Sequence, residues 1–431
     1  MRDFCISDRI LFTAILYTVN ERDCDILIIG AGAAGLAAAQ KLREAGKSAI
    51  VLEARDHVGG RVHTRRERGI VEAGAEFVHG EHAATWELIK SLGLPTQEWR
   101  AGESSFRVFS TGNGIRPDSE TLLADMRKAE EGLYEYRGPD ETVADFMKAR
   151  AVSDESLFFA ERHIGDLEGA DAQNLGAVAL ASEGALATNG PRNFWITGGY
   201  DQVVRALAEG SDIRLNCAAS RVEWKEGDVR VACEDGSVFT SRQLILTLPV
   251  GVLRARSVSF VPELPDSFHD AAGRIGFGNN TKLVLWLKKP LEDFGMLDSD
   301  GLFGHFWQRL FGEESVLVGY SGGSRADALA SMSENDATAS GIEEVAGAFG
   351  SGFKDQIAEA RHFTWSNDPF TLGSYSYAPP GIGSARAELS APIEHTIYYA
   401  GEATNAHGHT ATVHGAIEAG RDVAATILKQ S

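Results

Sequence analysis

Apolar and polar positions near the start of this chain form the pattern of a strand, a helix and a second strand in close succession. Asp25 to Ile29 is an apolar-rich run, Leu36 to Ala45 is rich in alanine and ends at Gly46, and Ser48 to Leu52 is apolar again. Short apolar runs on either side of a helical segment are typical of strands buried on both faces. We therefore predict a βαβ unit whose two strands lie parallel in one sheet.

The rest of the chain alternates between helical and strand patterns. Apolar residues recur at helical spacing from Leu122 to Leu133, and Ser153 precedes two acidic residues as a helix cap does. Alternating apolar positions around Val231 lead into Asp235-Gly236, a hairpin turn signal. Further helices are predicted from 198 to 207 and from 412 to 428, and further strands at 244–249, 281–287, 315–320 and 397–402.

The length of 431 residues and this order of elements predict an α/β protein with two interleaved domains. A Rossmann-type dinucleotide-binding domain is expected from three separated segments, 23–90, 190–255 and 386–431. An α+β substrate-binding domain is expected from the insertions between them, 91–189 and 256–385. Residues 1–22 are an N-terminal extension, whose apolar run is too short to span a bilayer.

A glycine-rich turn joins the first strand to its helix. Gly30 permits the tight turn, Gly32 lets the backbone approach a pyrophosphate, and Gly35 brings the helix close to the strand. The helix N-terminus then presents unpaired N–H groups to phosphate. Glu53 follows the second strand, where an acidic residue accepts hydrogen bonds from ribose hydroxyls. Together these residues predict a dinucleotide site.

A glycine pair with two arginines follows in the run Glu53-Ala-Arg-Asp-His-Val-Gly-Gly-Arg61. Gly60 keeps the backbone bare, and Arg55 and Arg61 can direct guanidinium groups at phosphate oxygens. A basic surface loop is the alternative interpretation. The run resembles the Gly-Gly-Arg signature of flavoproteins of the amine oxidase superfamily. This resemblance implies that the dinucleotide is FAD rather than NAD, and that the Rossmann-type domain is an FAD-binding domain.

The C-terminal residues Ala400-Gly-Glu-Ala-Thr404 and Ala411-Thr-Val-His-Gly-Ala416 resemble a second block of the flavin amine oxidases. The resemblance implies that Glu402, after Gly401, lies near the ribityl and phosphate groups. It also implies that a helix N-terminus at Thr412 and Val413 points at the flavin, where its dipole stabilises negative charge. Thr412 alone also fits an ordinary helix cap. Further cofactor contacts are implied at Gly74, Ala75, Glu76 and Val222.

The segment Phe363-Thr-Trp-Ser-Asn-Asp-Pro-Phe-Thr-Leu-Gly-Ser-Tyr-Ser-Tyr377 resembles the wall on the substrate side of the flavin in polyamine oxidases and lysine-specific histone demethylases. The resemblance places Trp365 against the isoalloxazine and Tyr375 in an aromatic cage, where aromatic faces attract an amine nitrogen. Aromatic residues in a strand otherwise belong to a core. Ser374 stands where monoamine oxidases carry the flavin-linking cysteine, which implies non-covalent FAD.

Lys282 lies in the apolar run Asn280-Thr-Lys-Leu-Val-Leu-Trp-Leu287. A lysine in a strand with two apolar faces is costly unless it is paired or functional. The resemblance implies that Lys282 contacts flavin N5 through water and assists reoxidation by oxygen. The alternative is an edge-strand lysine whose ammonium group reaches solvent.

Three residues are assigned to the substrate by the same resemblance. His79 and Glu168 match positions at which polyamine oxidases contact the distal amines of the substrate, and a carboxylate suits a cationic chain. Thr412 stands where monoamine oxidases carry the second aromatic residue of the cage, which favours the polyamine oxidase and demethylase branch. Glu168 also fits an ordinary carboxylate on a helix.

Charge and cysteine content narrow the classes of partner. The net charge of -20 disfavours nucleic acid and anionic membranes and is compatible with cationic substrates. The four cysteines, Cys5, Cys24, Cys217 and Cys233, have spacings that indicate neither a metal site nor a disulfide framework. We expect a cytoplasmic protein without membrane insertion, present as a monomer or a homodimer.

The resemblance extends from about Asp23 to Leu428 and implies an FAD-dependent amine oxidase with catalytic residues Lys282, Trp365 and Tyr375. The implied reaction converts a primary or secondary amine, such as a polyamine, to an imine by hydride transfer to flavin N5. Oxygen then reoxidises the flavin to give hydrogen peroxide, and the imine hydrolyses to an aldehyde. The alternatives are an L-amino acid oxidase or an FAD-dependent dehydrogenase or desaturase on the same fold, and a non-catalytic flavoprotein scaffold.

Overall fold

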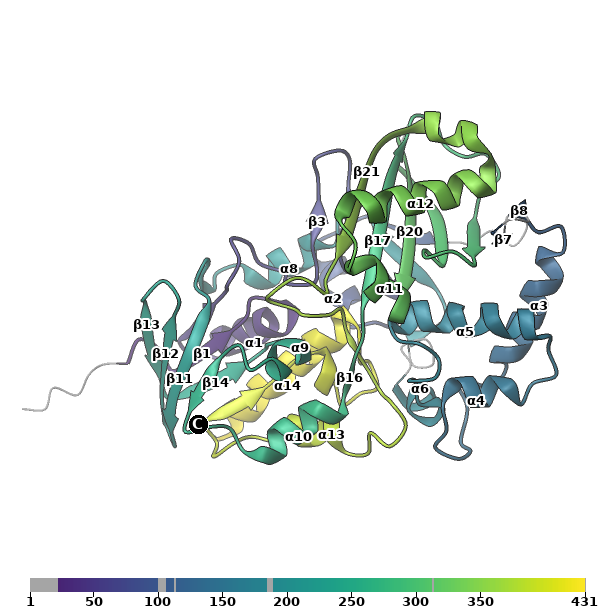
Figure 1. Cartoon of the computed structure of the whole chain (residues 1–431). Coiled ribbons are helices and arrows are strands. Elements are labelled where there is room, and N and C mark those ends of the chain that lie inside the picture. The colour runs from purple at the N-terminus through teal and green to yellow at the C-terminus, as the bar shows by residue number, and fades with distance from the viewer. Residues whose placement is uncertain (1–21, 100–105, 112–113, 184–188, 312–313, 431) are drawn as a thin grey trace, which may run out of the picture.

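The computed structural model describes residues 22–99, 106–111, 114–183, 189–311 and 314–430, which form two parts lying side by side (Figure 1). The first part contains strands β1 (Ile26–Ile29), β2 (Ala49–Leu52), β10 (Asp212–Arg214), β14 (Gln243–Leu246) and β23 (Ile397–Tyr399). They form one sheet of order β10-β2-β1-β14-β23 in which every neighbouring pair is parallel. The predicted βαβ unit is confirmed.

Helices cover one face of this parallel sheet, namely α1 (Ala33–Glu44), α8 (Asp201–Ala208) and α14 (Val413–Gln430). Ile26 and Ile28 face this helical layer, because successive strand residues point to opposite faces. A Cβ atom on Gly420 of α14 would lie 2.1 Å from the carbonyl oxygen of Ala34. Small residues therefore allow α14 to pack closely against the alanine-rich α1.

A second layer covers the opposite face of the parallel sheet. It contains strands β11 (Ala219–Lys225), β12 (Asp228–Cys233), β13 (Val238–Ser241) and β15 (Ser259–Val261), in the order β13-β12-β11-β15. Three helices complete the layer, namely α9 (Val250–Arg254), α10 (Asp266–Arg274) and α13 (Ala385–Leu389). Leu27 and Ile29 of β1 share one hydrophobic core with this layer.

The second part is built on a larger sheet. Its strands are β7 (Phe106–Ser110), β8 (Gly114–Ile115), β17 (Asn280–Leu287), β18 (Met296–Ser299), β19 (His305–Phe311), β20 (Glu314–Gly322) and β21 (Ile357–Thr364). Their order is β21-β17-β20-β19-β18-β7-β8, so β17 lies inside the sheet between β21 and β20. The long helix α12 (Glu334–Phe349) packs against this sheet, and α11 (Gly323–Ala330) follows β20.

A helical group completes the second part, at the right of Figure 1. It consists of α3 (Ser119–Glu130), α4 (Val143–Lys148), α5 (Asp154–Glu168) and α6 (Ala177–Glu183). Ser153 caps α5 as predicted, because its hydroxyl accepts a hydrogen bond of 3.1 Å from the Ser156 amide. The helix ends at Gly169, whose φ of 70° is a left-handed conformation that favours glycine.

The remaining described elements are short. Three strands form a small sheet, namely β5 (Val78–His79), β6 (Thr96–Trp99) and β9 (Asn193–Ile196). Two strand pairs are β3 (Thr64–Arg65) with β4 (Val71–Glu72), and β16 (Gly276–Phe277) with β22 (Ser376–Tyr377). The others are helix α2 (Thr85–Ser91) and the 3₁₀ turns η2 (Ser351–Gln356) and η3 (Glu402–Thr404).

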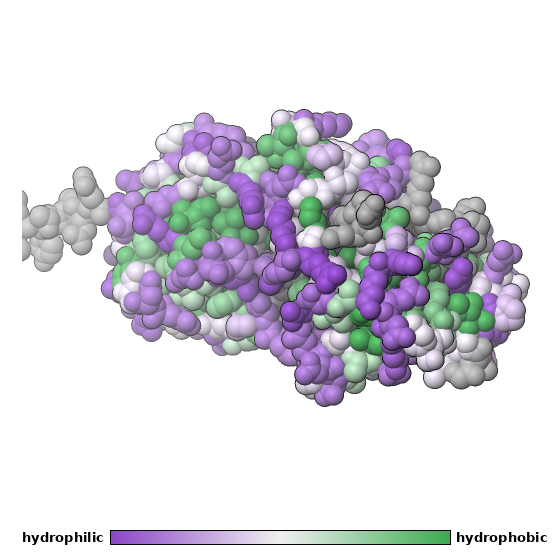
Figure 2. All heavy atoms as spheres, turned by 90° about the horizontal axis from the view of Figure 1, so that it is seen from above, coloured by the Kyte–Doolittle hydropathy of each residue, from purple (hydrophilic) through white to green (hydrophobic). Residues whose placement is uncertain are grey.

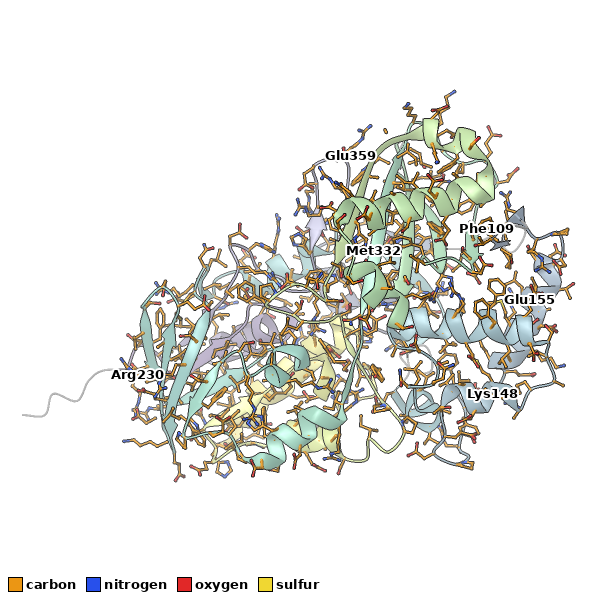
Figure 3. The ribbon with its side chains drawn as sticks, viewed as in Figure 1. Phe109, Lys148, Glu155, Arg230, Met332 and Glu359 are labelled. Carbon is orange, nitrogen blue, oxygen red and sulfur yellow. The ribbon has the colours of Figure 1, made fainter. Side chains whose placement is uncertain are left out.

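Hydrophilic side chains spread over much of the face seen in Figure 2, with smaller apolar areas between them. Lys148, Glu155 and Arg230 are examples of exposed charged side chains (Figure 3). Within the part of the chain that the structure describes, no helix combines the length and the apolar character needed to cross a membrane.

The expected α/β architecture is confirmed, with differences at the ends of elements. Helix α1 begins at Ala33, three residues before the predicted start, because it follows Gly32 directly. The parallel sheet takes strands from all three segments predicted for the nucleotide domain, although Phe260 and Phe268, predicted for the other domain, pack in the core beneath it. The domain boundaries therefore stay a prediction, and residues 1–21 of the predicted extension lie outside the described residues.

Candidate active site

A cavity of about 750 Å³ lies between the two parts of the molecule. One wall follows the carboxyl ends of β1, β2 and β14, where open α/β sheets bind ligands. The other wall belongs to β17, β19 and β20. All predicted site residues line this cavity except Gly35 and Val222.

The glycine turn after β1 has the geometry of a phosphate cradle. A Cβ on Gly35 would lie 2.0 Å from the carbonyl oxygen of Gly30, so Gly35 is required for the close contact of helix and strand. A Cβ on Gly32 would meet no atom of the described residues within 4 Å, yet Gly32 lines the cavity. Packing within the protein therefore does not require a glycine at 32, whereas a ligand close to the backbone does.

Glu53 is oriented by the same turn. Its carboxylate oxygens accept hydrogen bonds from the amides of Ala31 at 2.7 Å and Arg55 at 2.9 Å. The side chain is buried and lines the cavity. Each carboxylate oxygen keeps a further lone pair, which suits the predicted contact with ribose hydroxyls.

Arg55 and Arg61 line the cavity but have carboxylate partners in the protein. Arg55 makes a bidentate ion pair with Asp368, at 2.8 and 2.9 Å. Arg61 donates to Glu402 at 2.9 Å and to the carbonyl oxygen of Ser374 at 2.6 Å. The glycine-arginine loop is thereby joined to the aromatic segment and to the C-terminal block. Sequence reasoning missed Asp368, which lay in a segment considered only for its aromatic residues.

Glu402 organises the start of the last helix. Its carboxylate accepts hydrogen bonds from the Ser376 hydroxyl at 2.6 Å and the Ala411 amide at 3.0 Å. Burial opposes ionisation, but the Arg61 guanidinium holds the pKa of Glu402 below its ordinary value. Thr412 caps α14 by accepting a hydrogen bond of 2.9 Å from the Gly415 amide. The helix N-terminus with Val413 consequently lies at the cavity wall.

Lys282 occupies an interior strand, so the edge-strand alternative is wrong. Its ammonium group donates to the carbonyl oxygens of Glu72 at 3.2 Å and Gly74 at 2.8 Å, and to the Glu76 carboxylate at 2.7 Å. These three acceptors match the three N–H groups of a lysine. Lys282 still lines the cavity. The predicted contact with a water molecule requires one N–H group to be shared between that water and a protein acceptor.

Glu76 supplies the charge that pairs with Lys282. Its carboxylate also accepts hydrogen bonds from the indoles of Trp195 at 3.1 Å and Trp307 at 3.2 Å. Burial would raise the pKa of Glu76, but Lys282 and Arg309 hold it below its ordinary value. The sequence suggested Glu76 as a cofactor contact, whereas the structure also makes it the counter-ion of Lys282.

Aromatic side chains form a further part of the cavity wall. The indole of Trp365 donates to the carbonyl oxygen of Ala73 at 3.1 Å. The hydroxyl of Tyr375 donates to the carbonyl oxygen of Leu167 at 2.6 Å and lies 3.2 Å from the Tyr320 hydroxyl. Trp307 stacks obliquely on Tyr320, with ring centroids 5.7 Å apart. Sequence reasoning missed Trp307 and Tyr320, because they resemble core residues of their strands.

The predicted substrate contacts His79 and Glu168 also line the cavity. His79 shares a hydrogen bond of 2.8 Å with Asn193. Glu168 stands at the end of α5, and burial together with the Glu183 carboxylate raises its pKa to about 7. Ser374, which by the resemblance stands where monoamine oxidases carry the flavin-linking cysteine, accepts a hydrogen bond of 2.7 Å from the Asn280 amide.

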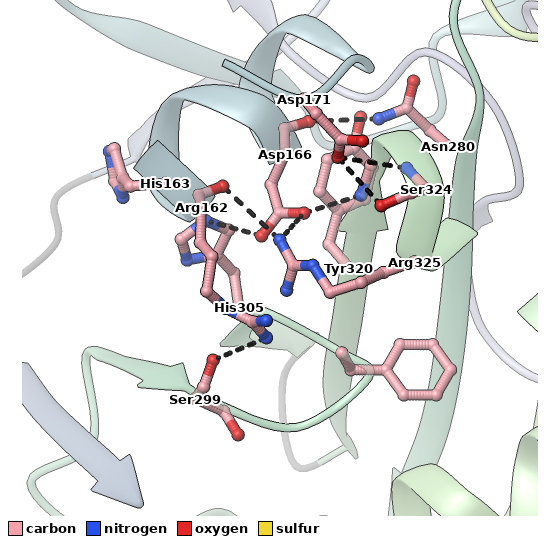
Figure 4. Close-up of polar contacts among 12 residues, drawn as sticks. Arg162, His163, Asp166, Asp171, Asn280, Ser299, His305, Tyr320, Ser324 and Arg325 are labelled. Atoms are coloured by element: carbon pink, nitrogen blue, oxygen red, sulfur yellow. Dashed lines mark hydrogen bonds and ion pairs between the residues drawn. The ribbon is translucent and has the colours of Figure 1, made fainter. Parts of the chain in front are cut away.

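A buried polar network holds the end of α5 that carries Glu168 (Figure 4). Asp166 accepts hydrogen bonds from Arg325 at 2.6 Å and from the Gly322 amide at 2.7 Å. His305 lies 3.2 Å from Asp166 and also contacts Asp298 at 2.5 Å. Because Leu167 follows Asp166, this network also positions the carbonyl group that receives the Tyr375 hydroxyl.

Val222, an implied cofactor contact, has its side chain in the core, and its contact with the cofactor stays a prediction. Its side chain is fully buried in the core between the four-stranded sheet and the parallel sheet, and it does not line the cavity. The neighbouring cavity wall is formed by Cys217, Ala218 and Ala219.

Comparisons with known proteins agree with this geometry. Residues 33–428 match the family of flavin containing amine oxidoreductases. The chain is 30% identical to polyamine oxidase 4 of Oryza sativa subsp. japonica, with 94% of this chain and 90% of that protein covered. It is 28% identical to lysine-specific histone demethylase 1 homolog 2 of the same organism, with 94% of this chain but 57% of that longer protein covered.

Solved structures share the fold. Wild-type putrescine oxidase bound to putrescine aligns with a TM-score of 0.81 at 24% identity, covering 94% of this chain and 99% of that one. Cyclohexylamine oxidase from Brevibacterium oxydans aligns with a TM-score of 0.80 at 23% identity, covering 95% and 99%. With the dinucleotide cradle, the Glu53 carboxylate and the family match together, the chain belongs to the flavin-containing amine oxidoreductases, in their polyamine oxidase and demethylase-like branch, with FAD as its cofactor.

Proposed function

We propose that this enzyme oxidises a small-molecule amine, primary or secondary and with polyamines as candidates, and that oxygen is its electron acceptor. The observation that carries the proposal is the cavity itself. It joins the dinucleotide cradle at Gly30 and Gly32 to the aromatic wall at Trp365 and Tyr375, and Lys282 lines the same cavity. A cofactor and a small substrate therefore share one enclosed space, as hydride transfer requires.

The residues present fit FAD. The Gly32 backbone and the α1 N-terminus would hold the pyrophosphate, Glu53 the ribose, and the α14 N-terminus at Thr412 and Val413 the flavin ring. When bound, FAD supplies a two-electron acceptor for the hydride from the carbon beside the amine nitrogen. The described cavity wall supplies binding, orientation and exclusion of water.

The aromatic wall orients the amine without reacting with it. Burial raises the pKa of Tyr375 well above its ordinary value, so the phenol keeps its proton and does not act as a base. Its hydroxyl proton is donated to the carbonyl oxygen of Leu167, and the residue lines the cavity. Electron-rich ring faces attract an amine nitrogen.

Glu168 favours a substrate with a second cationic group. Among the described residues no hydrogen-bond partner of its carboxylate is present, although it lines the cavity and lies near Glu183. An ammonium group would relieve the burial cost that raises its pKa. A diamine or polyamine is therefore expected to bind better than a monoamine of equal length.

An L-amino acid oxidase needs a cation for the substrate carboxylate, usually arginine. Among described arginines, those that line the cavity are Arg55 and Arg61, and both are paired with carboxylates on the cofactor side. The arrangement favours amines over amino acids. A non-catalytic scaffold requires no such enclosed aromatic wall.

A peroxide assay over monoamines, diamines, polyamines and L-amino acids tests the proposal. Peroxide from one of the amine classes supports it, with diamines ahead of monoamines. In a Glu168→Gln variant the preference for diamines should disappear, while monoamine turnover stays the same. Peroxide with L-amino acids alone, or with no substrate in the panel, would contradict the proposal.

A further inference from the structure

Two cysteines without a role in amine oxidation meet in the wall of the cofactor cavity. The Sγ atoms of Cys217 and Cys233 are 2.6 Å apart. This separation is shorter than ordinary contact between unbonded heavy atoms and about half an ångström longer than a disulfide bond. Both side chains are buried, with 3% and 5% of their surface exposed.

Their backbone positions hold the two thiols together. Cys217 lies just before β11 and Cys233 is the last residue of β12, which is antiparallel to β11. The Cys233 amide donates to the Ser237 carbonyl oxygen at 2.9 Å, and the Cys217 amide donates to the Glu53 carbonyl oxygen at 2.8 Å. The thiol pair is therefore anchored to the β-hairpin on one side and to the residue that faces the ribose on the other.

We propose that Cys217 and Cys233 form a dithiol that closes to a disulfide in the wall of the adenosine end of the cavity. The oxidant is hydrogen peroxide, which is either added or formed by the proposed amine oxidation. Cys217 reduces one peroxide, giving a sulfenic acid and one water. The Cys233 sulfur then attacks that sulfur, its thiol hydrogen leaves with the sulfenic hydroxyl as a second water, and the S–S bond forms.

The order of these two steps follows from the position of each thiol. Cys217 lines the cavity, whereas Cys233 does not. Burial raises the pKa of Cys233 to about 12, which keeps this thiol protonated and a poor first reactant. Its contact with Cys217 offsets that disadvantage in the second step, because the reaction is then intramolecular.

The cross-link has a direct consequence for the cofactor. It ties the β11–β12 hairpin to the loop that is hydrogen bonded to Glu53, and so restricts the opening of the wall. FAD is expected to leave the oxidised protein more slowly than the reduced protein. FAD bound in the cavity is in turn expected to slow the access of peroxide to Cys217.

The experiment uses the full-length chain with Cys5→Ser and Cys24→Ser, which leaves two of its four cysteines. Apo and FAD-loaded samples are treated with hydrogen peroxide, denatured and titrated with a thiol reagent. We expect two free thiols to fall to none, dithiothreitol to restore both, and mass spectrometry to find the linked peptides two hydrogen atoms lighter. The apo sample should react at least about threefold faster.

Variants with Cys217→Ser or Cys233→Ser provide the controls, since neither can form the cross-link. In both, the release of FAD should not depend on peroxide. Two titratable thiols after excess peroxide would overturn the proposal, as would oxidation that yields only sulfinic acid without linked peptides. Equal rates of FAD release from oxidised and reduced protein would overturn its link to the cofactor. Because peroxide is added, absence of amine oxidase activity would contradict the proposed function but not this disulfide.

Discussion

Lys282 belongs both to a buried ion pair and to the wall of the cavity. Its ammonium group is buried against Glu76 and two backbone carbonyls, and it also lines the cavity. An ion pair with so little exposure is costly to break, because the remaining charge stays buried without a partner. A test of its chemistry must therefore separate reactivity from stability.

We expect Lys282→Met to slow the reaction of reduced enzyme with oxygen by at least about tenfold, equivalent to about 1.4 kcal/mol of transition-state stabilisation. Anaerobic reduction by substrate should change little. The variant should also lose up to about 3–5 kcal/mol of unfolding free energy, since the buried Glu76 carboxylate loses its hydrogen-bonded counter-ion. Stopped-flow flavin absorbance measures the two half-reactions, and denaturant unfolding measures the stability.

The double variant Lys282→Met with Glu76→Gln is the matched control. It removes the unpaired charge while the side-chain oxygen of residue 76 can still accept from Trp195 and Trp307. Stability should recover and the slow reaction with oxygen should persist. Oxygen reactivity equal to that of the parent enzyme would remove Lys282 from the catalytic residues.

Glu168 predicts a pH dependence of stability. Burial raises its pKa from the ordinary value of 4.5 to about 7 in the folded apo protein, so the native state binds more protons than the unfolded state between these values. The ionised carboxylate of Glu168 destabilises the native state. This destabilisation is absent below about pH 4.5, grows between pH 4.5 and about pH 7, and is complete above about pH 7. We expect Glu168→Gln to raise the melting temperature at pH 8 but not at pH 4.5. An equal change in melting temperature at pH 8 and at pH 4.5 would contradict the raised pKa.

Glu53→Ala is expected to weaken FAD binding by about one to two decades, because hydrogen bonds to a carboxylate contribute about 1.5–3 kcal/mol. The alanine also leaves the Ala31 and Arg55 amides without their acceptor. Glu53→Gln, which keeps one acceptor oxygen, should lie between alanine and the parent. Retention of flavin through dialysis measures the effect, and unchanged retention in both variants would exclude the ribose contact.

At the scale of elements, the turn from β1 into α1 contains two glycines that are required for different reasons. Gly35→Ala should destabilise the fold with or without FAD, by about 1–3 kcal/mol, because its Cβ would overlap the Gly30 carbonyl oxygen. Gly32→Ala should leave apo stability within about 0.5 kcal/mol, because its Cβ meets no protein atom, while FAD binding is lost. Apo unfolding and flavin titration distinguish them. Normal FAD binding by Gly32→Ala would contradict the phosphate cradle.

At the scale of the whole molecule, the cofactor site draws on both parts and needs no covalent link. Ser374 stands, by the resemblance, where monoamine oxidases carry the linking cysteine, and its hydroxyl is occupied by a hydrogen bond of 2.7 Å from the Asn280 amide. Acid precipitation should therefore release all yellow flavin into the supernatant. FAD should also raise the melting temperature in a concentration-dependent way, because it binds the folded chain alone. Flavin retained on the denatured polypeptide would contradict non-covalent binding.

The sequence by itself determined the features that depend on neighbouring residues. The βαβ unit, the close contact of helix and strand at Gly35 and the cap at Ser153 all follow from local periodicity and backbone conformation. Resemblance extended this to the family and to the aromatic segment, because its motifs are also continuous in the chain.

Only the tertiary structure decided the contacts between distant segments. Three pairs of residues show this: Arg55 with Asp368, Lys282 with Glu76, and Cys217 with Cys233. Nothing in the local sequence of either member indicates its partner. The burial of the Val222 side chain was likewise decided by packing, and its predicted contact with the cofactor stays a prediction. Local sequence specifies backbone direction and burial period, whereas the choice of partner depends on how the packed sheets bring separate segments to one cavity.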